Sequence, residues 1–227
     1  MRLTIAGEEL EARADATLWW PRASTLLAAD LHLGKDAVFR AAGQAVPEGS
    51  SPGTLARLAG AVEHTRARRL VLLGDVVHGR ASLNDGLRAE VESWRARLAE
   101  LEVLVVLGNH DRAAGSVPAE LGATVSDEHV APPFLFRHEP CARDGAVVIA
   151  GHVHPGVVLR DSVGKLRLRC FHLSEAAIVL PAFGDFTGMQ EVEPAPADRV
   201  LAIAGEKVVE VPRAALPRGR AVRRGDQ

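Results

Sequence analysis

The apolar runs of this chain are short, rich in Val, Leu and Ile, and mostly bounded by glycine, proline or charge. Strands that are buried on both faces of a sheet have this pattern. Between the early runs, residues 51–69 and 84–102 carry apolar side chains at three-to-four spacing, which predicts amphipathic helices. From about residue 123 onward, strand-like runs follow one another with short turns. We therefore expect an α/β fold, with a mixed sheet or two stacked sheets and helices outside.

The composition suits a single domain. With 47% hydrophobic and 25% charged residues among 227, the chain can bury a sizeable core. We expect one domain over residues 1–212 and a basic C-terminal tail over residues 213–227, where arginines gather. The formal net charge of −2 gives no overall reason to bind nucleic acid, and such a tail is more often a solvated terminus than a binding arm.

Cysteine usage and hydropathy predict the compartment. Cys141 and Cys170 are too few for a disulfide framework and form no CxxC pair, which favours a reducing compartment. The N-terminal residues include acids where a secretion signal needs a basic start, and no apolar run approaches the length of a membrane span. We expect a cytoplasmic protein with no membrane partner.

Three of the predicted strands end in the same kind of polar side chains. These are Asp30 and His32, then Asp75 and His78, then Asn109 and His110. Two further runs end in His138 and in the pair His152 and His154. If the strands are parallel, their carboxyl ends meet on one edge of the sheet, where open α/β sheets place their ligands.

The residue types at these strand ends indicate metal binding. Imidazole suits transition metals, whereas carboxylate and amide oxygens suit harder divalent ions. A mixture of both on one edge predicts two metal ions with one carboxylate between them. Gly74, Gly108 and Gly151 stand just before these residues, where the backbone must turn sharply or approach a bound group, although glycine is also common in ordinary turns.

Taken in order, these residues resemble the motifs of the calcineurin-like metallophosphoesterases. The matching residues are Asp30-Leu31-His32, Gly74-Asp75, Gly108-Asn109-His110-Asp111, His138 and Gly151-His152-Val153-His154. The resemblance implies a four-layer α/β/β/α sandwich with two mixed β-sheets and outer helices. It also implies two metal sites, one formed by Asp30, His32, Asp75 and His154, and the other by Asp75, Asn109, His138 and His152.

The resemblance implies phosphodiester hydrolysis by in-line attack of a metal-bridging hydroxide. Mn²⁺ is the expected metal, and Fe, Ni and Zn accept the same ligands. By the same resemblance, His110 protonates the leaving oxygen or stabilises its charge. Arg112 could bracket phosphoryl oxygens, or it could form a surface ion pair.

His78 stands where many phosphatases of the family have an aspartate, which is similar to the double-strand-break repair nucleases. It is therefore a candidate second catalytic imidazole, with a plain turn residue as the alternative. The stretches "DLHLGKDAVFRAAGQAVPEG" and "PAFGDFTG", together with the metal motifs, resemble the bacterial ligase-associated DNA damage response endonucleases. This narrower resemblance implies a DNA repair endonuclease acting on single-stranded DNA, with an ATP-dependent DNA ligase, an exonuclease and a helicase as partners. Lys35 and Arg40 could contact the DNA backbone, or could simply be solvated.

Two other functions remain open at this point. The same active site could serve a phosphatase or phosphodiesterase of small or cyclic nucleotides. Alternatively, the chain could be a catalytically disabled binding module, like the metallophosphoesterase-like subunit of the retromer coat. The complete ligand set and His110 count against the binding module.

Overall fold

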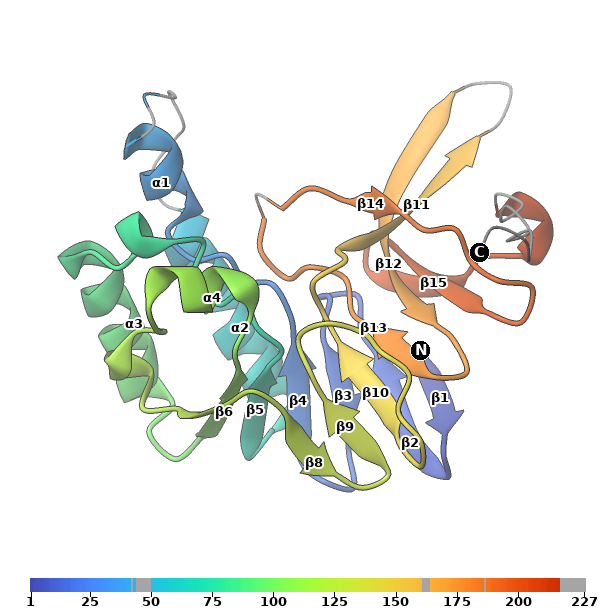
Figure 1. The fold of residues 1–227 in the computed structure, drawn as a ribbon, viewed down its shortest axis with the longest axis horizontal. Helices are drawn as coiled ribbons and strands as arrows, with labels where there is room; N and C mark the ends of the chain where they lie inside the picture. The colour runs from blue at the N-terminus through green and yellow to red at the C-terminus, as the bar shows by residue number, and fades with distance from the viewer. Residues whose placement is uncertain (42, 44–49, 161–163, 186, 217–227) are drawn as a thin grey trace, which may run out of the picture.

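The computed structural model describes residues 1–41, 43, 50–160, 164–185 and 187–216. In this part of the chain, two β-sheets lie face to face, and helices cover the outer face of the first sheet (Figure 1). The first sheet has seven strands in sequence order. They are β1 (Arg2–Ile5), β2 (Glu8–Ala12), β3 (Leu18–Trp20), β4 (Thr25–Ala28), β5 (Arg69–Leu72), β6 (Glu102–Val106) and β7 (Thr124–Ser126).

The second sheet has nine strands in the described residues, and parallel and antiparallel pairs occur in both sheets. Its strands are β8 (His129–Ala131), β9 (Phe134–Phe136), β10 (Val147–Ala150), β11 (Pro155–Arg160), β12 (Lys165–Leu173), β13 (Ala177–Val179), β14 (Gln190–Glu191), β15 (Arg199–Ala204) and β16 (Lys207–Glu210). The expected pair of mixed, stacked sheets is confirmed.

Strands β4, β5 and β6 are parallel neighbours, which confirms that their carboxyl ends meet on one edge. The connections between them carry the helices α1 (Lys35–Ala41), α2 (Ser50–Thr65) and α3 (Asp85–Arg97), and α4 (Asn109–Ala114) follows β6. Short 3₁₀ turns are η1 (Arg80–Ser82), η2 (Ala119–Leu121) and η3 (Arg213–Ala215). The segments predicted to be helical correspond to α2 and α3, whereas α1 and α4 had no apolar periodicity long enough to be predicted.

The two faces of the first sheet belong to two different hydrophobic cores. Leu26, Leu70 and Val103 are adjacent across β4, β5 and β6, and they pack with the apolar sides of α2 and α3. The next residue of β4, Leu27, points to the opposite face and packs between the sheets, with Phe134 of β9. This alternation follows from the period of two along a strand, and burial on both faces explains why the runs are continuously apolar.

The outer face of the second sheet is covered in part by irregular chain. The described side chains that pack on the outer face of the second sheet, over Leu135 and Val148, include Cys141 and Ala146. These come from the irregular connection between β9 and β10 and not from a helix. Pro140 and Gly145 lie in this short connection, and both residue types disfavour a helix interior.

The folded part extends into the segment that was assigned to the tail. Residues 213–215 form η3, and Leu216 is buried against a core that includes Val211. The remainder of the predicted tail, residues 217–227, lies outside the described residues. Within the described part of the chain, no helix combines the length and apolar character needed to cross a bilayer.

Candidate metal centre

The predicted ligands come together where strand ends of the two sheets meet. Asp30 and His32 follow β4, Asp75 follows β5, and Asn109 is the first residue of α4, after β6. The second sheet contributes His138 after β9, and His152 and His154 after β10. Because β9 and β10 are also parallel, both sheets deliver ligands from carboxyl ends.

Most of these ligands have an unusual backbone conformation. Five predicted ligands adopt the left-handed region that non-glycine residues rarely occupy: Asp30 (φ 55°), His32 (φ 48°), Asp75 (φ 50°), His152 (φ 69°) and His154 (φ 51°). Hydrogen bonds between the loops hold this conformation, since the Asp30 amide donates to the Gly74 carbonyl at 3.1 Å and the His32 amide donates to the Asp75 carbonyl at 2.9 Å. Strain of this kind, of order 1–3 kcal/mol per residue, collects at functional sites.

Two glycines allow the strand ends to approach closely. Gly74 has φ 80°, and a Cβ there would collide with the ring of His138. A Cβ on Gly108 would overlap the backbone nitrogen and carboxylate of Asp75. Glycine is therefore required at both positions for the ligands to occupy these places.

Three ligands form the first cluster: Asp30, His32 and His154, whose ligand atoms lie within 4.8 Å of one another. The Nε2 atoms of His32 and His154 are 3.2 Å apart, and Nε2 of His154 is 3.6 Å from Oδ1 of Asp30. The Asp30 side chain is fully buried, and it accepts hydrogen bonds from the His152 amide at 2.9 and 3.1 Å. A buried carboxylate beside two imidazoles offers donors that suit a divalent transition metal.

The second cluster combines Asp75, His138 and His152, again with ligand atoms within 4.8 Å of one another. Nδ1 of His152 lies 3.0 Å from Nε2 of His138, and Oδ1 of Asn109 lies 3.1 Å from each of these nitrogens. All four predicted ligands of this site, Asp75, Asn109, His138 and His152, are therefore together.

Asp75 lies between the two clusters. Its Oδ1 is 3.5 Å from Nε2 of His138, and its Oδ2 is 3.9 Å from Nε2 of His32. One oxygen therefore faces each cluster, as the proposed bridging carboxylate requires. The His110 amide donates to Asp75 Oδ1 at 2.9 Å and fixes the carboxylate in this orientation.

The hydrogen bonds of His138 show that this group of atoms suits a cation. Nδ1 of His138 lies 2.8 Å from the Leu73 carbonyl, so this nitrogen carries the proton and donates. In the neutral ring, Nε2 is then an unprotonated acceptor that faces Oδ1 of Asn109 and Oδ1 of Asp75. These three acceptor atoms, with Nδ1 of His152 3.0 Å from Nε2 of His138, form a set of donors that a metal ion could share.

Burial keeps His32 neutral, as a metal ligand must be. Burial, followed by the charges of His154 and His78, lowers the pKa of His32 to about 2. At neutral pH its ring therefore has a free electron pair for a metal.

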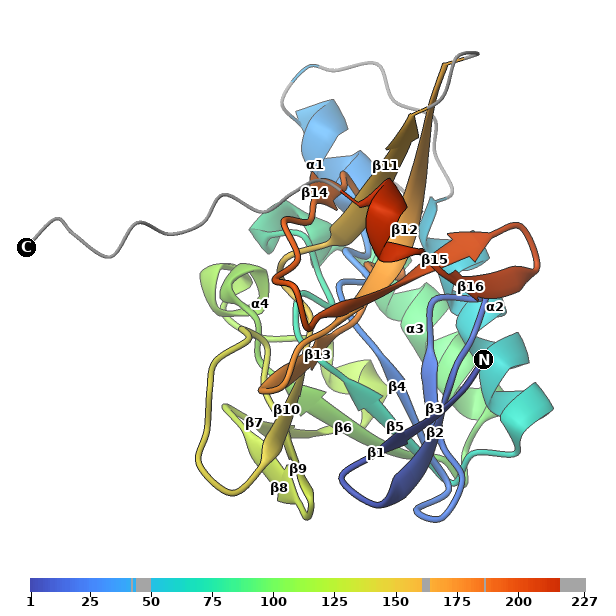
Figure 2. The same ribbon diagram turned by 90° about the vertical axis from the view of Figure 1, so that its right-hand side faces the viewer.

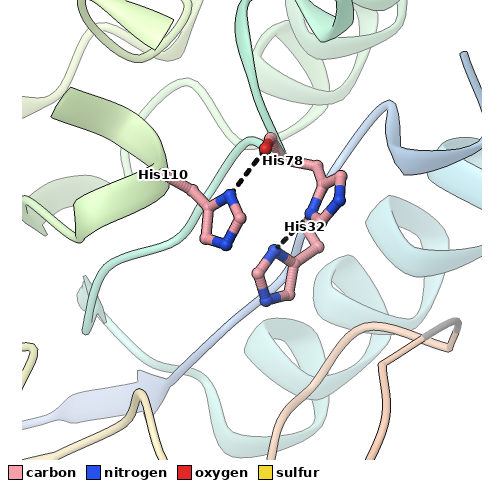
Figure 3. Close-up of side chains that lie close together, drawn as sticks. All are labelled: His32, His78 and His110. Atoms are coloured by element: carbon pink, nitrogen blue, oxygen red, sulfur yellow. Dashed lines mark hydrogen bonds between the residues drawn. The ribbon is translucent and has the colours of Figure 1, made fainter. Parts of the chain in front are cut away.

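A third imidazole group lies beside the first cluster and comprises His32, His78 and His110 (Figure 3). Nδ1 of His78 is 3.1 Å from Nδ1 of His32, and the rings of His78 and His110 stack with centroids 4.7 Å apart. Nδ1 of His110 donates to the His78 carbonyl at 2.7 Å. This bond leaves Nε2 of His110 free, 4.0 Å from Oδ2 of Asp75. Burial and the neighbouring cationic groups, Lys35 first, lower the pKa of His78 to about 4.

The structure does not bring Arg112 into this group. Its exposed guanidinium donates to the Leu107 carbonyl and to Asp127, each at 2.8 Å, and so forms the surface ion pair that was the alternative for this residue. Of the two possible DNA contacts, Lys35 lies near the imidazoles, and burial lowers its pKa. Arg40 pairs with Asp36 one helical turn away, at 3.1 Å.

Asp111 has a role that the sequence analysis did not assign. Its buried carboxylate accepts hydrogen bonds from the amides of Gly108 and Val77, each at 3.0 Å. It therefore ties the start of α4, which carries Asn109 and His110, to the loop that carries Asp75. The sequence contains a pattern that indicates this role, because an acid at the third position of a helix commonly accepts a hydrogen bond from the amide at the start of the helix.

The chain is similar to known proteins in sequence and in structure. Residues 23–140 match the model of the calcineurin-like phosphoesterase family. The crystal structure of the Pseudomonas putida nuclease MPE is similar, with 40% identity and a TM-score of 0.83 over 93% of this chain and 99% of that one. The E. coli phosphoesterase Yfce is more distant, with 15% identity and a TM-score of 0.42 over 85% of this chain and 99% of that one. No curated protein matches the sequence.

Proposed function

Because the chain belongs to the calcineurin-like phosphoesterase family and is a metallophosphoesterase, we propose that it is a metal-dependent endonuclease acting on single-stranded DNA. The observation that carries the proposal is the placement of Asp75, with one oxygen toward each of two ligand clusters and His110 beside it. The similarity to a nuclease over almost the whole chain favours a polynucleotide substrate.

The ligands divide into two sets. Asp30, His32 and His154 would hold one divalent ion, and Asn109, His138 and His152 would hold the other, with Asp75 shared. When bound, two such ions lower the pKa of a water and clamp the phosphoryl oxygens for in-line displacement. Mn²⁺ is the proposed metal, because the mixture of imidazole with carboxylate and amide oxygens suits it, although Fe, Ni and Zn accept the same donors.

His110 is the proposed general acid. Its Nδ1 proton is used in the bond to the His78 carbonyl, which holds the ring in place. The free Nε2 faces the region between the clusters, where a scissile phosphate has to bind. A proton carried on Nε2 can pass to the leaving oxygen as the P–O bond breaks.

His78 is proposed as the residue that orients His110 and His32. Its carbonyl fixes His110, and its ring contacts both His110 and His32. An imidazole at this position adds no negative charge close to the substrate, unlike the aspartate of many phosphatases in the family. Polynucleotide phosphates would meet less repulsion here as a result.

The proposal includes a place in DNA repair, with an ATP-dependent DNA ligase, an exonuclease and a helicase as partners. This part is supported by the resemblance of the stretches after Asp30 and around Phe183 to the ligase-associated endonucleases. Association of the purified protein with such a ligase, measured by analytical ultracentrifugation, tests it. A mixture that sediments as separate proteins would remove the ligase from the proposal.

Nicking of circular single-stranded DNA in Mn²⁺ tests the central claim, with Asp75→Asn as the matched control. We expect the wild type to cleave the DNA and the control variant not to. We also expect the wild type to hydrolyse nucleotide monoesters and cyclic nucleotides more slowly than it cleaves DNA. If protein that contains two metal ions per chain leaves DNA intact but hydrolyses a small nucleotide, the endonuclease proposal is wrong and the substrate is the nucleotide.

A further inference from the structure

The hairpin of β11 and β12 begins at the metal centre and extends away from it. Pro155, the first residue of β11, directly follows the ligand His154. The two strands are antiparallel, and Gly156 pairs with Arg169 near the base. The hairpin and α1 project from the same end of the molecule (Figures 1 and 2).

The register gives this hairpin two chemically different faces. Paired residues of antiparallel strands lie on the same face, and the pairs alternate between faces. One face carries Gly156 with Arg169, Val158 with Arg167, and Arg160 with Lys165. The other face carries Val157 with Leu168, and Leu159 with Leu166. We call the first of these the basic face, because four of its six side-chain positions are Arg or Lys.

The base of the apolar face packs on this protein's own core, whereas Leu166 near the tip is exposed. Val157 packs with Cys170 and Val200 in a buried cluster, and Leu159 and Leu168 lie against it. This packing fixes the orientation of the hairpin and leaves the long cations of the basic face exposed.

The base of the basic face is joined directly to the metal centre. Arg169 donates to the Ala182 carbonyl at 2.9 Å and to the Gly184 carbonyl at 2.7 Å. The Gly184 amide in turn donates to the carbonyl of the ligand Asp30 at 3.1 Å. Arg169 therefore has a structural role, because it holds the base of the basic face beside the metal centre.

The outer cations are accessible and only partly neutralised. Arg160, Lys165 and Arg167 are exposed. Arg160 pairs with Glu191 at 3.1 Å, and Arg167 has a weak contact with the Met189 carbonyl at 3.3 Å. Among the described residues, Glu191 provides the only ion pair to this face. The face is thus left with a surplus of positive charge.

We propose that the basic face of this hairpin, chiefly Lys165 and Arg167, binds the sugar-phosphate backbone of a single-stranded nucleic acid whose scissile phosphate is at the metal centre. The inference rests on the proposed function and adds the path of the strand beyond the reacting bond. Val158, the partner of Arg167, lies four residues beyond His154, which at about 3.3 Å per residue is roughly 13 Å. This separation exceeds the spacing between neighbouring phosphates of a single strand, so the face binds phosphates that take no part in the chemistry.

The composition of the basic face also determines which parts of the nucleic acid it contacts. It has no aromatic side chain on which bases could stack, and its long cations contact phosphates. Binding is therefore independent of base sequence and falls with rising salt.

The test compares wild type with Lys165→Ala/Arg167→Ala in Mn²⁺, with fluorescence anisotropy of a single-stranded 20-mer as the binding readout. Removing two phosphate contacts reduces the slope of log K against log salt by about 1.4 and weakens binding roughly 10- to 30-fold at 0.1 M salt. Hydrolysis of bis(p-nitrophenyl) phosphate stays at the wild-type rate, because this small diester does not reach the hairpin.

Two controls separate the hairpin from net charge and from folding. Lys207→Ala/Arg213→Ala removes two exposed cations outside the hairpin and should leave binding within about twofold. Lys165→Arg/Arg167→Lys keeps the charge and should restore the salt slope. An unchanged slope in the double alanine variant, or an equal loss in the remote variant, would overturn the proposed path.

Cleavage of DNA is measured separately from binding, so that the endonuclease proposal and the binding surface are tested independently. If the wild type binds the 20-mer through the hairpin but never cuts it, the endonuclease proposal fails while the binding surface stands. If it cuts DNA with no contribution from Lys165 and Arg167, the binding surface fails while the endonuclease proposal stands.

Discussion

Replacing His110 with alanine separates proton donation from metal binding at this site. The ring contributes a free Nε2, whereas the bond that fixes Asp75 comes from the His110 backbone amide, at 2.9 Å. Alanine keeps that amide, so both metal sites should remain intact. The ring's own hydrogen bond, from Nδ1 to the His78 carbonyl, only holds the imidazole in position.

The expected loss of kcat in the His110→Ala variant depends on the leaving group of the substrate. A positioned general acid contributes about 10²- to 10⁴-fold, or roughly 2.7–5.5 kcal/mol of barrier. On DNA, whose leaving alkoxide needs a proton, we expect kcat to fall by this factor. On bis(p-nitrophenyl) phosphate, whose leaving phenolate is stable without a proton, the loss should be less than about tenfold.

The assay measures kcat on both substrates, with metal content per chain measured on the same samples. The expected result is two metal ions per chain, a large loss on DNA and a small loss on the nitrophenyl diester. An equal loss on both substrates would refute proton donation by His110. A loss of metal would show instead that the ring helps to hold an ion.

The remaining predictions test the bridging ligand, the residue excluded from the site, and the charge state of a ligand. Asp75→Asn should reduce metal content below two ions per chain and activity by more than 10²-fold; full metal occupancy would show that the carboxylate is not shared. Arg112→Ala should change kcat/KM less than about twofold, because its exposed guanidinium pairs with Asp127 and contacts none of the ligands; a 10²-fold loss would return it to the active site. In metal-free protein, His32 has a pKa of about 2 when folded and 6.5 when unfolded, so only the unfolded chain gains a proton between these values. Stability should therefore fall by up to about 1.4 kcal/mol per pH unit below pH 6.5, and equal melting temperatures at pH 7 and pH 5 would contradict this.

Local patterns predicted the strands of this fold well because burial on both faces leaves a continuous apolar run. The runs that end at Ala28, Leu72 and Val106 are β4, β5 and β6, and their parallel pairing follows from the helices between them. The short helix α4 was not predicted, because six residues carry too little periodicity. Its start at Asn109 matters for function, since the first turn orients both Asn109 and His110.

The sequence by itself determined which side chains are available as ligands and that they follow strand ends, because residue type and strand periodicity are local properties. Only the tertiary structure decided that the two oxygens of Asp75 face different clusters, that Arg112 pairs with Asp127, and that Lys165 and Arg167 share an outward face. These outcomes depend on the register between strands and on contacts between segments far apart in the chain. No local window contains that information, because it arises only when the two sheets pack.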